Sequence, residues 1–312
     1  APALFSYIQV ICDAANDTGM YLLTGSQDFL LSQRIAQSLA GRVAILHLLP
    51  FSIAELKGTA FQKESWEEYA YYGFYPRIYD RDLEPHRWYA DYVQTYLERD
   101  VRETINIGDL RTFRQFLGVC AGRIGQVINF SSIGNDVGVS YQTVKRWISI
   151  LEASNIITLL QPYHRNFGKR IVKSPKLYFN DPGLASYLLG IRSPGDTASH
   201  FARGSLFESL VLGEIAKSFY NRGERPILYF WRDSAGNEVD CLIENRGRLF
   251  PVEMKSGQTF NTDFLSGLKL FKGLAQVTPE ESSLVYGGTS AQSREGIGIL
   301  PWSTLEELPG LR

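Results

Sequence analysis

Residues 237–256, NEVDCLIENRGRLFPVEMKS, decide how the C-terminal part of this chain folds and where its chemistry lies. Two runs rich in apolar residues flank the polar segment 245–248, NRGR, and this pattern is typical of a β-hairpin. We take Glu244 and Leu249 as the pair that closes the loop, and this choice sets the register of every opposed pair along the two strands.

In this register Asp240 lies directly opposite Glu253, and opposed side chains on one face are ~5 Å apart at Cβ. Lys255 follows Glu253 by two residues and therefore shares its face. The other face is expected to be apolar and to pack in a core, with Val239, Val252 and Met254.

Two neighbouring ionised carboxylates repel each other unless a cation, a proton or a lysine compensates. A divalent ion such as Mg²⁺ prefers oxygen ligands, and it could lower the pKa of a bound water and stabilise charge on a phosphate. Lys255 would then position or deprotonate that water, or bind the phosphate. The alternative is an ion pair in which Lys255 neutralises one carboxylate and no chemistry takes place.

The composition describes an ordinary globular protein of 312 residues, with 44% hydrophobic and 21% charged residues, long enough for two or three compact units. The formal net charge of -1 excludes a globally basic nucleic-acid binder, so such binding requires local patches. Three distant cysteines without C-x-x-C spacing argue against a structural zinc site and for a reducing compartment. No apolar run is long enough for a membrane helix, and we expect a cytoplasmic protein without a membrane partner.

The hairpin belongs to a C-terminal α/β region. An amphipathic helix is expected at residues 205–217, and strands at 227–232, 238–243, 249–255 and 283–286.

The middle of the chain is mostly helical and contains a helix-turn-helix pattern at residues 131–152. The turn lies at Gly138, Ser140 is the expected N-cap of the second helix, and one side of this helix is apolar. The expected buried residues are Val144, Trp147, Ile148 and Leu151. Strands at 156–160 and 176–179 follow, so the unit is expected to be a winged helix.

The wing is strongly basic, because no acidic residue occurs between Leu159 and Asn180. A loop of one charge sign can contact phosphates of DNA or RNA. The alternative is a solvated basic loop in a winged helix that contacts only a protein partner or a second copy of the chain. The candidate nucleic-acid-binding residues are Gln142, Lys145, Arg146, Arg165, Lys169, Arg170 and Lys173, and Lys176 adds to the same basic run.

The first sixty residues alternate apolar runs with helical patterns. Helices are expected at 1–12 and 28–39, and apolar strands at 20–24 and 43–49 are bounded by turn residues. This order predicts part of a parallel α/β sheet.

Asp240 and the sequence Glu253-Met-Lys255 on the next strand, with Glu208 on the preceding helix, resemble the PD-(D/E)xK nuclease-like core. The resemblance implies that Asp240 and Glu253 bind a divalent metal, that Lys255 is catalytic and that Glu208 assists. One departure is Val239, which stands where the family pattern has a proline.

Segments 21–27, 38–43 and 48–56, together with 73–76 and 96–101, resemble a family of prokaryotic AAA-type ATPases with a C-terminal domain of unknown function. That family carries a P-loop and an acidic Walker B strand, and no G-x-x-x-x-G-K-[ST] loop occurs here, so we expect an N-terminally truncated member. The resemblance implies that Thr24 and Ser26 end a sensor strand near the γ-phosphate of ATP in the full-length parent. Arg42 would serve in phosphate or subunit contacts, or in a local ion pair.

The predicted fold class is therefore α/β in three parts. Residues 1–60 are part of a P-loop-type sheet, 61–195 a helical lid and winged helix, and 196–312 a restriction-endonuclease-like domain. The predicted function is that of an AAA-type fragment coupling nucleotide state to nucleic-acid or partner binding. The alternatives are a non-enzymatic binding module and a metal-dependent nuclease that uses Asp240, Glu253 and Lys255.

Overall fold

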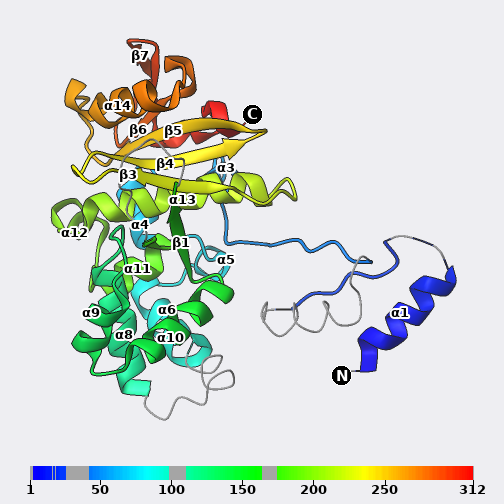
Figure 1. Cartoon of the computed structure of the whole chain (residues 1–312). Helices are drawn as coiled ribbons and strands as arrows, with labels where there is room; N and C mark the ends of the chain where they lie inside the picture. The colour runs from blue at the N-terminus through cyan, green and yellow to red at the C-terminus, as the bar shows by residue number, and fades with distance from the viewer. Residues whose placement is uncertain are drawn as a thin grey trace.

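A computed structural model describes residues 3–15, 17, 19–25, 42–97, 110–163 and 174–311. The fold is mixed α/β, as predicted, with helices stacked below a sheet in Figure 1. The N-terminal helix α1, Ala3–Ala15, lies to one side of the sheet in the same view.

The middle region is built from helices whose aromatic side chains pack inward. Trp66, Tyr69, Phe74 and Tyr89 are each at most 1% exposed, so these rings form a core. The helices are α3 Ile53–Leu56, α4 Trp66–Tyr72, α5 Pro76–Asp80, α6 Pro85–Tyr92, the π-helical η1 Val93–Leu97, α8 Leu110–Gly122, α9 Phe130–Val137, α10 Tyr141–Ala153, α11 Pro182–Leu188 and α12 Pro194–Ser199.

The predicted helix, turn and second helix are confirmed as α9, a turn at Gly138 and α10. Gly138 ends α9 in the left-handed conformation that favours glycine, and the Ser140 hydroxyl accepts the Thr143 N–H at the start of α10. The four side chains expected to be buried on α10 are all at most 5% exposed. After α10, β1 Ile157–Pro162 and β2 Lys176–Phe179 pair antiparallel, also as predicted.

One eight-stranded sheet runs through the middle and C-terminal regions, in the order β2-β1-β3-β4-β5-β6-β8-β7. The parallel pairing of β1 with β3 joins the strands of the middle region to those of the C-terminal region, so the sheet crosses the boundary expected at residue 195. The C-terminal strands are β3 Leu228–Arg232, β4 Glu238–Asn245, β5 Arg248–Lys255, β6 Ser283–Tyr286, β7 Gln292–Arg294 and β8 Ile297–Pro301. The first four lie where the sequence predicts strands.

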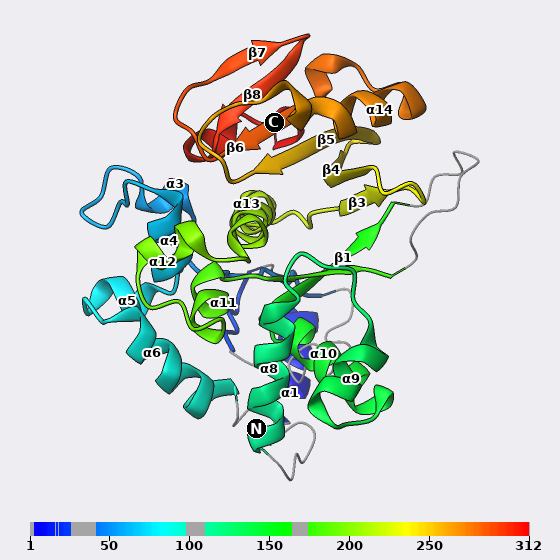
Figure 2. The same cartoon turned by 90° about the vertical axis from the view of Figure 1, so that its left-hand side faces the viewer.

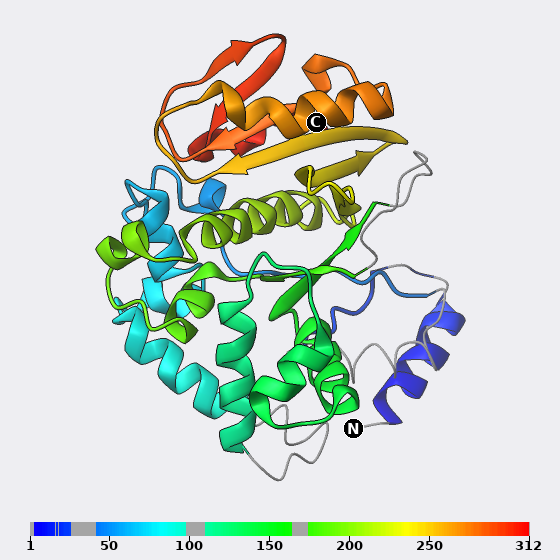
Figure 3. The same cartoon turned by 60° about the vertical axis from the view of Figure 1, so that its left-hand side comes forward.

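Helices cover both faces of the C-terminal sheet. The long helix α13, Arg203–Tyr220, lies between the sheet and helices α4 and α11 (Figure 2). Helix α14, Ser266–Ala275, covers the opposite face (Figure 3). Short 3-10 turns complete this region: η2 Thr262–Leu265, η3 Pro279–Glu281, η4 Trp302–Glu307 and η5 Pro309–Leu311.

The prediction of two strands near the N-terminus is wrong. Residues 20–24 and 43–49 form no strand, and Leu22 and Leu48 are 87% and 94% exposed. A strand requires a neighbouring strand to pair its backbone groups, and no strand pairs with either segment within the described part of the chain. The helix expected at 28–39 lies outside the described residues.

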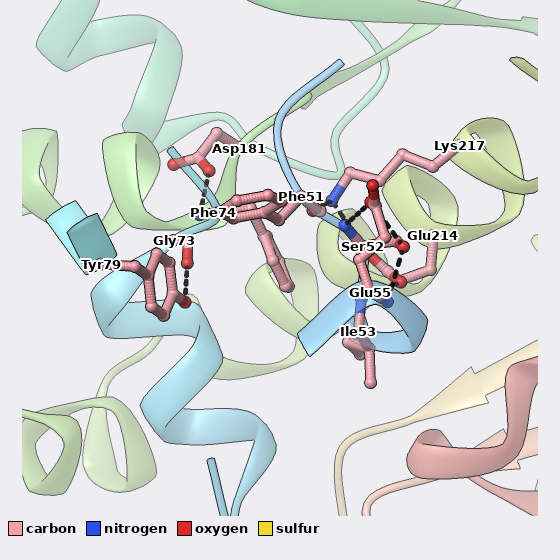
Figure 4. A network of polar contacts seen from close by, with 10 residues as sticks. All are labelled: Phe51, Ser52, Ile53, Glu55, Gly73, Phe74, Tyr79, Asp181, Glu214 and Lys217. Atoms are coloured by element: carbon pink, nitrogen blue, oxygen red, sulfur yellow. Dashed lines mark hydrogen bonds and ion pairs between the residues drawn. The ribbon is translucent and has the colours of Figure 1, made fainter. Parts of the chain in front are cut away.

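A buried polar network joins the segment after residue 50 to α13 (Figure 4). The Lys217 ammonium donates to the Phe51 carbonyl at 2.7 Å and to Glu214 Oε1 at 2.8 Å. Glu214 Oε2 accepts the Ile53 N–H at 2.7 Å, next to the Ser52–Glu55 capping box that starts α3. One buried ion pair therefore satisfies backbone groups of a distant segment.

The same network continues to Asp181, the buried N-cap of α11 (Figure 4). Its carboxylate accepts the N–H groups of Phe74 at 2.7 Å and Leu184 at 2.8 Å, and the Tyr89 hydroxyl at 2.6 Å. Phe51 in turn donates its N–H to the Phe74 carbonyl at 3.0 Å. Asp181 thus fixes three elements from within the core.

We expect Asp181→Ala to lower the free energy of unfolding by roughly 3 kcal/mol or more, because three buried donors lose their acceptor. The matched control is Asp196→Ala, which removes the exposed N3 carboxylate of the Ser193 capping box on α12 and should cost only about 1 kcal/mol. Urea denaturation followed by circular dichroism measures both values. Equal losses in the two variants would contradict this account of Asp181.

Candidate functional site

The hairpin at the centre of the candidate site has the predicted register. Glu244 pairs with Leu249, and the antiparallel ladder extends from Cys241/Val252 to Asn245/Arg248. The two-residue turn Arg246–Gly247 has positive φ at both positions, 52° and 75°, as a type I′ turn requires. The turn chemistry in the sequence therefore sets which residues of β4 and β5 face each other.

Asp240 lies where β4 is irregular. The pairing of β4 with β3 shifts by one residue between Tyr229 and Trp231, as in a β-bulge. The Asp240 carboxylate accepts the N–H of Met254 at 2.8 Å, so it bonds directly to the backbone of β5.

The same irregularity changes the apolar face of the hairpin. Val252 and Met254 pack in the large core on the α13 side, as expected. Val239 instead packs in the second core with Leu268 and Phe271 of α14, so its predicted place beside Val252 is wrong. An extra residue in a strand reverses which face the residues beyond it occupy, and strict alternation misses this.

The structure brings Asp240, Glu253 and Lys255 together. The Lys255 ammonium lies 2.5 Å from Glu253 Oε1 and 3.9 Å from Asp240 Oδ2. Both carboxylates are buried, at 5% and 7% exposure, whereas about a third of the Lys255 side chain is exposed. Within the described residues, Glu253 Oε2 has no hydrogen-bond partner although it is buried.

Glu208 approaches the same group from α13. The Tyr178 hydroxyl of β2 donates to Glu208 Oε2 at 2.6 Å. Burial and the negative charge of Asp240 raise the pKa of Glu208 to about 7. The fourth residue suggested by the resemblance therefore lies close enough to interact electrostatically with the hairpin carboxylates.

The electrostatics of the site show excess negative charge. Burial and the charge of Asp240 raise the pKa of Glu253 to about 8, and Lys255 only partly offsets this. Burial lowers the pKa of Lys255, but the charges of Asp240 and Glu253 outweigh it and raise the pKa overall. Lys255 is therefore an ammonium at neutral pH, which suits a phosphate-binding cation better than a proton acceptor.

Two members of the cluster, Tyr178 and Glu238, are absent from the sequence-based prediction, and a third, Lys176, is predicted only as part of the basic run. Lys176 of β2 is 3% exposed and forms an ion pair with Glu238 of β4. The prediction that Lys176 belongs to a solvent-facing basic wing is wrong, because its side chain is buried. The sequence does contain a signal for the burial of Lys176, namely that Leu177, Tyr178 and Phe179 follow it directly. The stem of a lysine beside such an apolar run commonly packs against apolar surface.

The donor set fits only a small part of a metal coordination sphere. Within the described ranges, no three His, Cys, Asp or Glu side chains converge closely enough to hold a metal ion. Asp240 and Glu253 offer two carboxylates, and Glu253 Oε2 is buried without a partner. Mg²⁺ is commonly held by one or two carboxylates, with water and phosphate completing the shell, so the pair fits this kind of site.

The candidate nucleic-acid-binding residues of α10 lie in solvent. Gln142, Lys145 and Arg146 are exposed, opposite the buried face of the helix. The other four candidates, Arg165, Lys169, Arg170 and Lys173, lie outside the described residues.

The candidate nucleotide contacts near the N-terminus do not meet in one described site. Thr24 is exposed in an irregular segment, and Ser26 lies outside the described residues. The Arg42 guanidinium forms an ion pair with Asp13 of α1, with Nε 2.6 Å from Oδ1. Arg42 was expected either to contact phosphate or a subunit, or to form a local ion pair, and the structure contains the local ion pair.

Among the described helices, none is both long and apolar enough to span a bilayer.

Comparison with known proteins relates the chain to bacterial proteins of similar sequence. Uncharacterized proteins of Mycobacterium tuberculosis and Mycobacterium bovis are each 28% identical over 259 residues, which is 83% of this chain and 57% of each relative. An uncharacterized protein of Haemophilus influenzae is 26% identical over 184 residues, 54% of this chain and 46% of that protein. The chain thus spans less than two thirds of the length of these relatives. No solved structure matches it.

Three protein families match successive parts of the chain. Residues 1–57 match an AAA domain, residues 63–195 a domain of unknown function (DUF8612), and residues 203–305 a second domain of unknown function (DUF4143). Together the matches support an AAA-type ATPase family that carries domains of unknown function.

Proposed function

We propose that this chain is the effector part of an AAA-type ATPase and engages nucleic acid through a winged helix made of α9, α10, β1 and β2. In the longer parent protein, ATP would bind near Thr24, Ser26 and Arg42, and the nucleotide state would change this engagement. The AAA match at residues 1–57 supports the ATPase part of the proposal. The winged helix and its ligand are inferred from the arrangement of the elements.

The charged face of α10 carries the proposal. Lys145 and Arg146 are exposed, and neither forms an ion pair with any described residue. Unneutralised cations on a helix that follows a tight turn are suited to contact the phosphate backbone. Gln142, one turn earlier, adds a side chain that can donate and accept hydrogen bonds.

The first test is the salt dependence of nucleic-acid binding. We expect the double variant Lys145→Ala/Arg146→Ala to bind a random 20-base-pair duplex more weakly. Its slope of log K against log salt should be smaller by about 2, because each lost phosphate contact contributes roughly 0.9. Fluorescence anisotropy between roughly 50 and 200 mM KCl measures the slope for duplex DNA and duplex RNA.

The matched control is Lys269→Ala/Lys272→Ala on α14, which removes the same charge from the far side of the sheet. It should retain the wild-type slope. Identical slopes in the two double variants would exclude α10 as the contact. Absence of any salt-sensitive binding by the wild type would favour a protein partner instead.

A metal-dependent nuclease is the second candidate function, and the buried, unpartnered Glu253 Oε2 favours it. Asp240 and Glu253 would hold a divalent cation, which supplies stabilisation of negative charge on a phosphate. Lys255 would bind and orient the phosphate as an ammonium. Glu208, with a pKa raised to about 7, would exchange a proton near neutral pH.

This candidate predicts cleavage of DNA or RNA with Mg²⁺ or Mn²⁺ that is abolished by Asp240→Ala and by Lys255→Ala. Gel electrophoresis of labelled substrates measures the cleavage, and Lys269→Ala serves as the control that should keep full activity. Cleavage that persists in both site variants would show that another site, or a contaminant, is responsible.

The cluster also predicts how stability depends on pH. Folding raises the pKa of Glu253 to about 8, so between about pH 4.5 and 8 the folded state binds more protons than the unfolded state. The free energy of unfolding should therefore fall as pH rises through this window, by up to roughly 1.4 kcal/mol per pH unit for one proton. Glu253→Gln should flatten this decline.

Urea denaturation at several pH values with a chelator present measures the decline. Glu306→Gln, at an exposed carboxylate paired with Lys57, is the control and should keep the wild-type pH dependence. Parallel curves for wild type and Glu253→Gln would mean that Glu253 titrates as an ordinary surface carboxyl.

A further inference from the structure

Lys176 is a buried cation supplied to the C-terminal cluster by the middle region of the chain. It is the first residue of β2, and β2 pairs with β1, the strand that follows α10 in the chain. Its ammonium forms an ion pair with Glu238 of β4 and lies 5.4 Å from the centre of the Phe230 ring of β3. Lys176, which the sequence places in a basic run, is thus held against β3 and β4 of the C-terminal sheet.

The Lys176 ammonium interacts with more than one carboxylate of the cluster. Burial lowers its pKa, but the charges of Glu208, Glu238 and Asp240 together outweigh burial and raise it. Two residues further along β2, the Tyr178 hydroxyl binds Glu208. One short strand therefore supplies both an ammonium and a hydroxyl to the acidic site.

The two lysines of the cluster divide its carboxylates between them. Lys255 binds Glu253 and lies near Asp240, whereas Lys176 binds Glu238. Buried carboxylates are costly unless a positive charge compensates them. The lysines thus provide from within the chain the compensation that a divalent cation would otherwise provide.

Glu238, which the Lys176 ammonium binds, lies two residues before Asp240 on β4, so a divalent cation at Asp240 and Glu253 would lie in the field of that ammonium. Like charges in a partly desolvated site repel more strongly than in water, because the effective dielectric constant is lower. The ion pair with Glu238 holds the ammonium in place, and Arg232 Nε, 3.6 Å from the other oxygen of Glu238, supports that carboxylate.

We propose that Lys176 is a built-in competitor of the divalent cation, by which the middle region limits metal loading of the Asp240/Glu253 site. This inference rests on the metal site of the second candidate function. Lys176 is a positioning and regulatory residue here, because it acts on the carboxylates and not on a substrate.

Calorimetric titration of Mn²⁺ into metal-free full-length chain tests the proposal. We expect Lys176→Met and Lys176→Gln to bind Mn²⁺ at least about tenfold more tightly than wild type, because the repulsion is removed. Lys176→Arg keeps the positive charge and should bind like wild type. Asp240→Asn in the Lys176→Met background should abolish the gain.

The Lys176 variants are chosen to keep the fold. Methionine matches the length of the lysine stem and packs well against an aromatic ring such as Phe230. Glutamine retains a hydrogen bond to Glu238, so one variant remains informative if the other fails to fold. Lys269→Met is the control, since Lys269 is also ion-paired, but with Glu295, and lies on α14 on the far side of the sheet. It should leave Mn²⁺ affinity unchanged.

The outcomes separate the inference from the proposed site. One outcome is that wild type, Lys176→Met and Lys176→Gln bind Mn²⁺ equally and that Asp240→Asn abolishes this binding. This outcome would keep the metal site and overturn the role of Lys176. A similar gain in Lys269→Met would also overturn it, because the effect would then come from the loss of any lysine charge and not from the position of Lys176. Absence of saturable Mn²⁺ binding in every variant would overturn the metal site and the competition together.

Discussion

The buried ion pair between Glu214 and Lys217 on α13 is the interaction on which the rest of the structure depends. Two charges removed from water are costly unless every remaining donor and acceptor is satisfied. The partners that satisfy them are the Phe51 carbonyl and the Ile53 N–H, which belong to a segment some 160 residues earlier in the chain. Desolvation therefore forces α13 and residues 51–53 to stay together.

Helix α13 connects this buried ion pair to the candidate site, because Glu208 lies on the same helix. Glu208 lies nine residues before Lys217 on the same continuous helix, a separation of roughly 14 Å along the axis. One face of α13 packs against the sheet that bears Asp240 and Glu253, and the other against α4 and α11 (Figure 2). Residues 51–53, near the C-terminal end of the AAA match, and the carboxylate cluster are thus held by a single helix.

Local patterns in the sequence predict a large part of this architecture. The turn residues around Arg246–Gly247 set the hairpin register, and Gly138 and Ser140 mark the ends of the two helices, because each effect acts within a few residues. The bulge that moves Val239 and the pairing of β1 with β3 depend on strands far apart in the chain. The burial of Lys176 follows from that pairing, so a local pattern of charge could only describe it as part of a basic wing.

The composition of the cluster bears on how the two candidate functions relate. Its carboxylates come from α13, β4 and β5, whereas Lys176 and Tyr178 come from the strand that completes the helix-turn-helix unit. Any ligand that shifts β2 must therefore change the charge balance around Glu208 and Glu238, because an ammonium and a hydroxyl move with the strand. Coupling between the proposed contact on α10 and the cluster then needs no long pathway, since β1 follows α10 directly and belongs to the same sheet as β4 and β5. The proposed nucleic-acid contact and the proposed metal site are for this reason compatible with each other, because β2 links the helix-turn-helix elements to the carboxylate cluster.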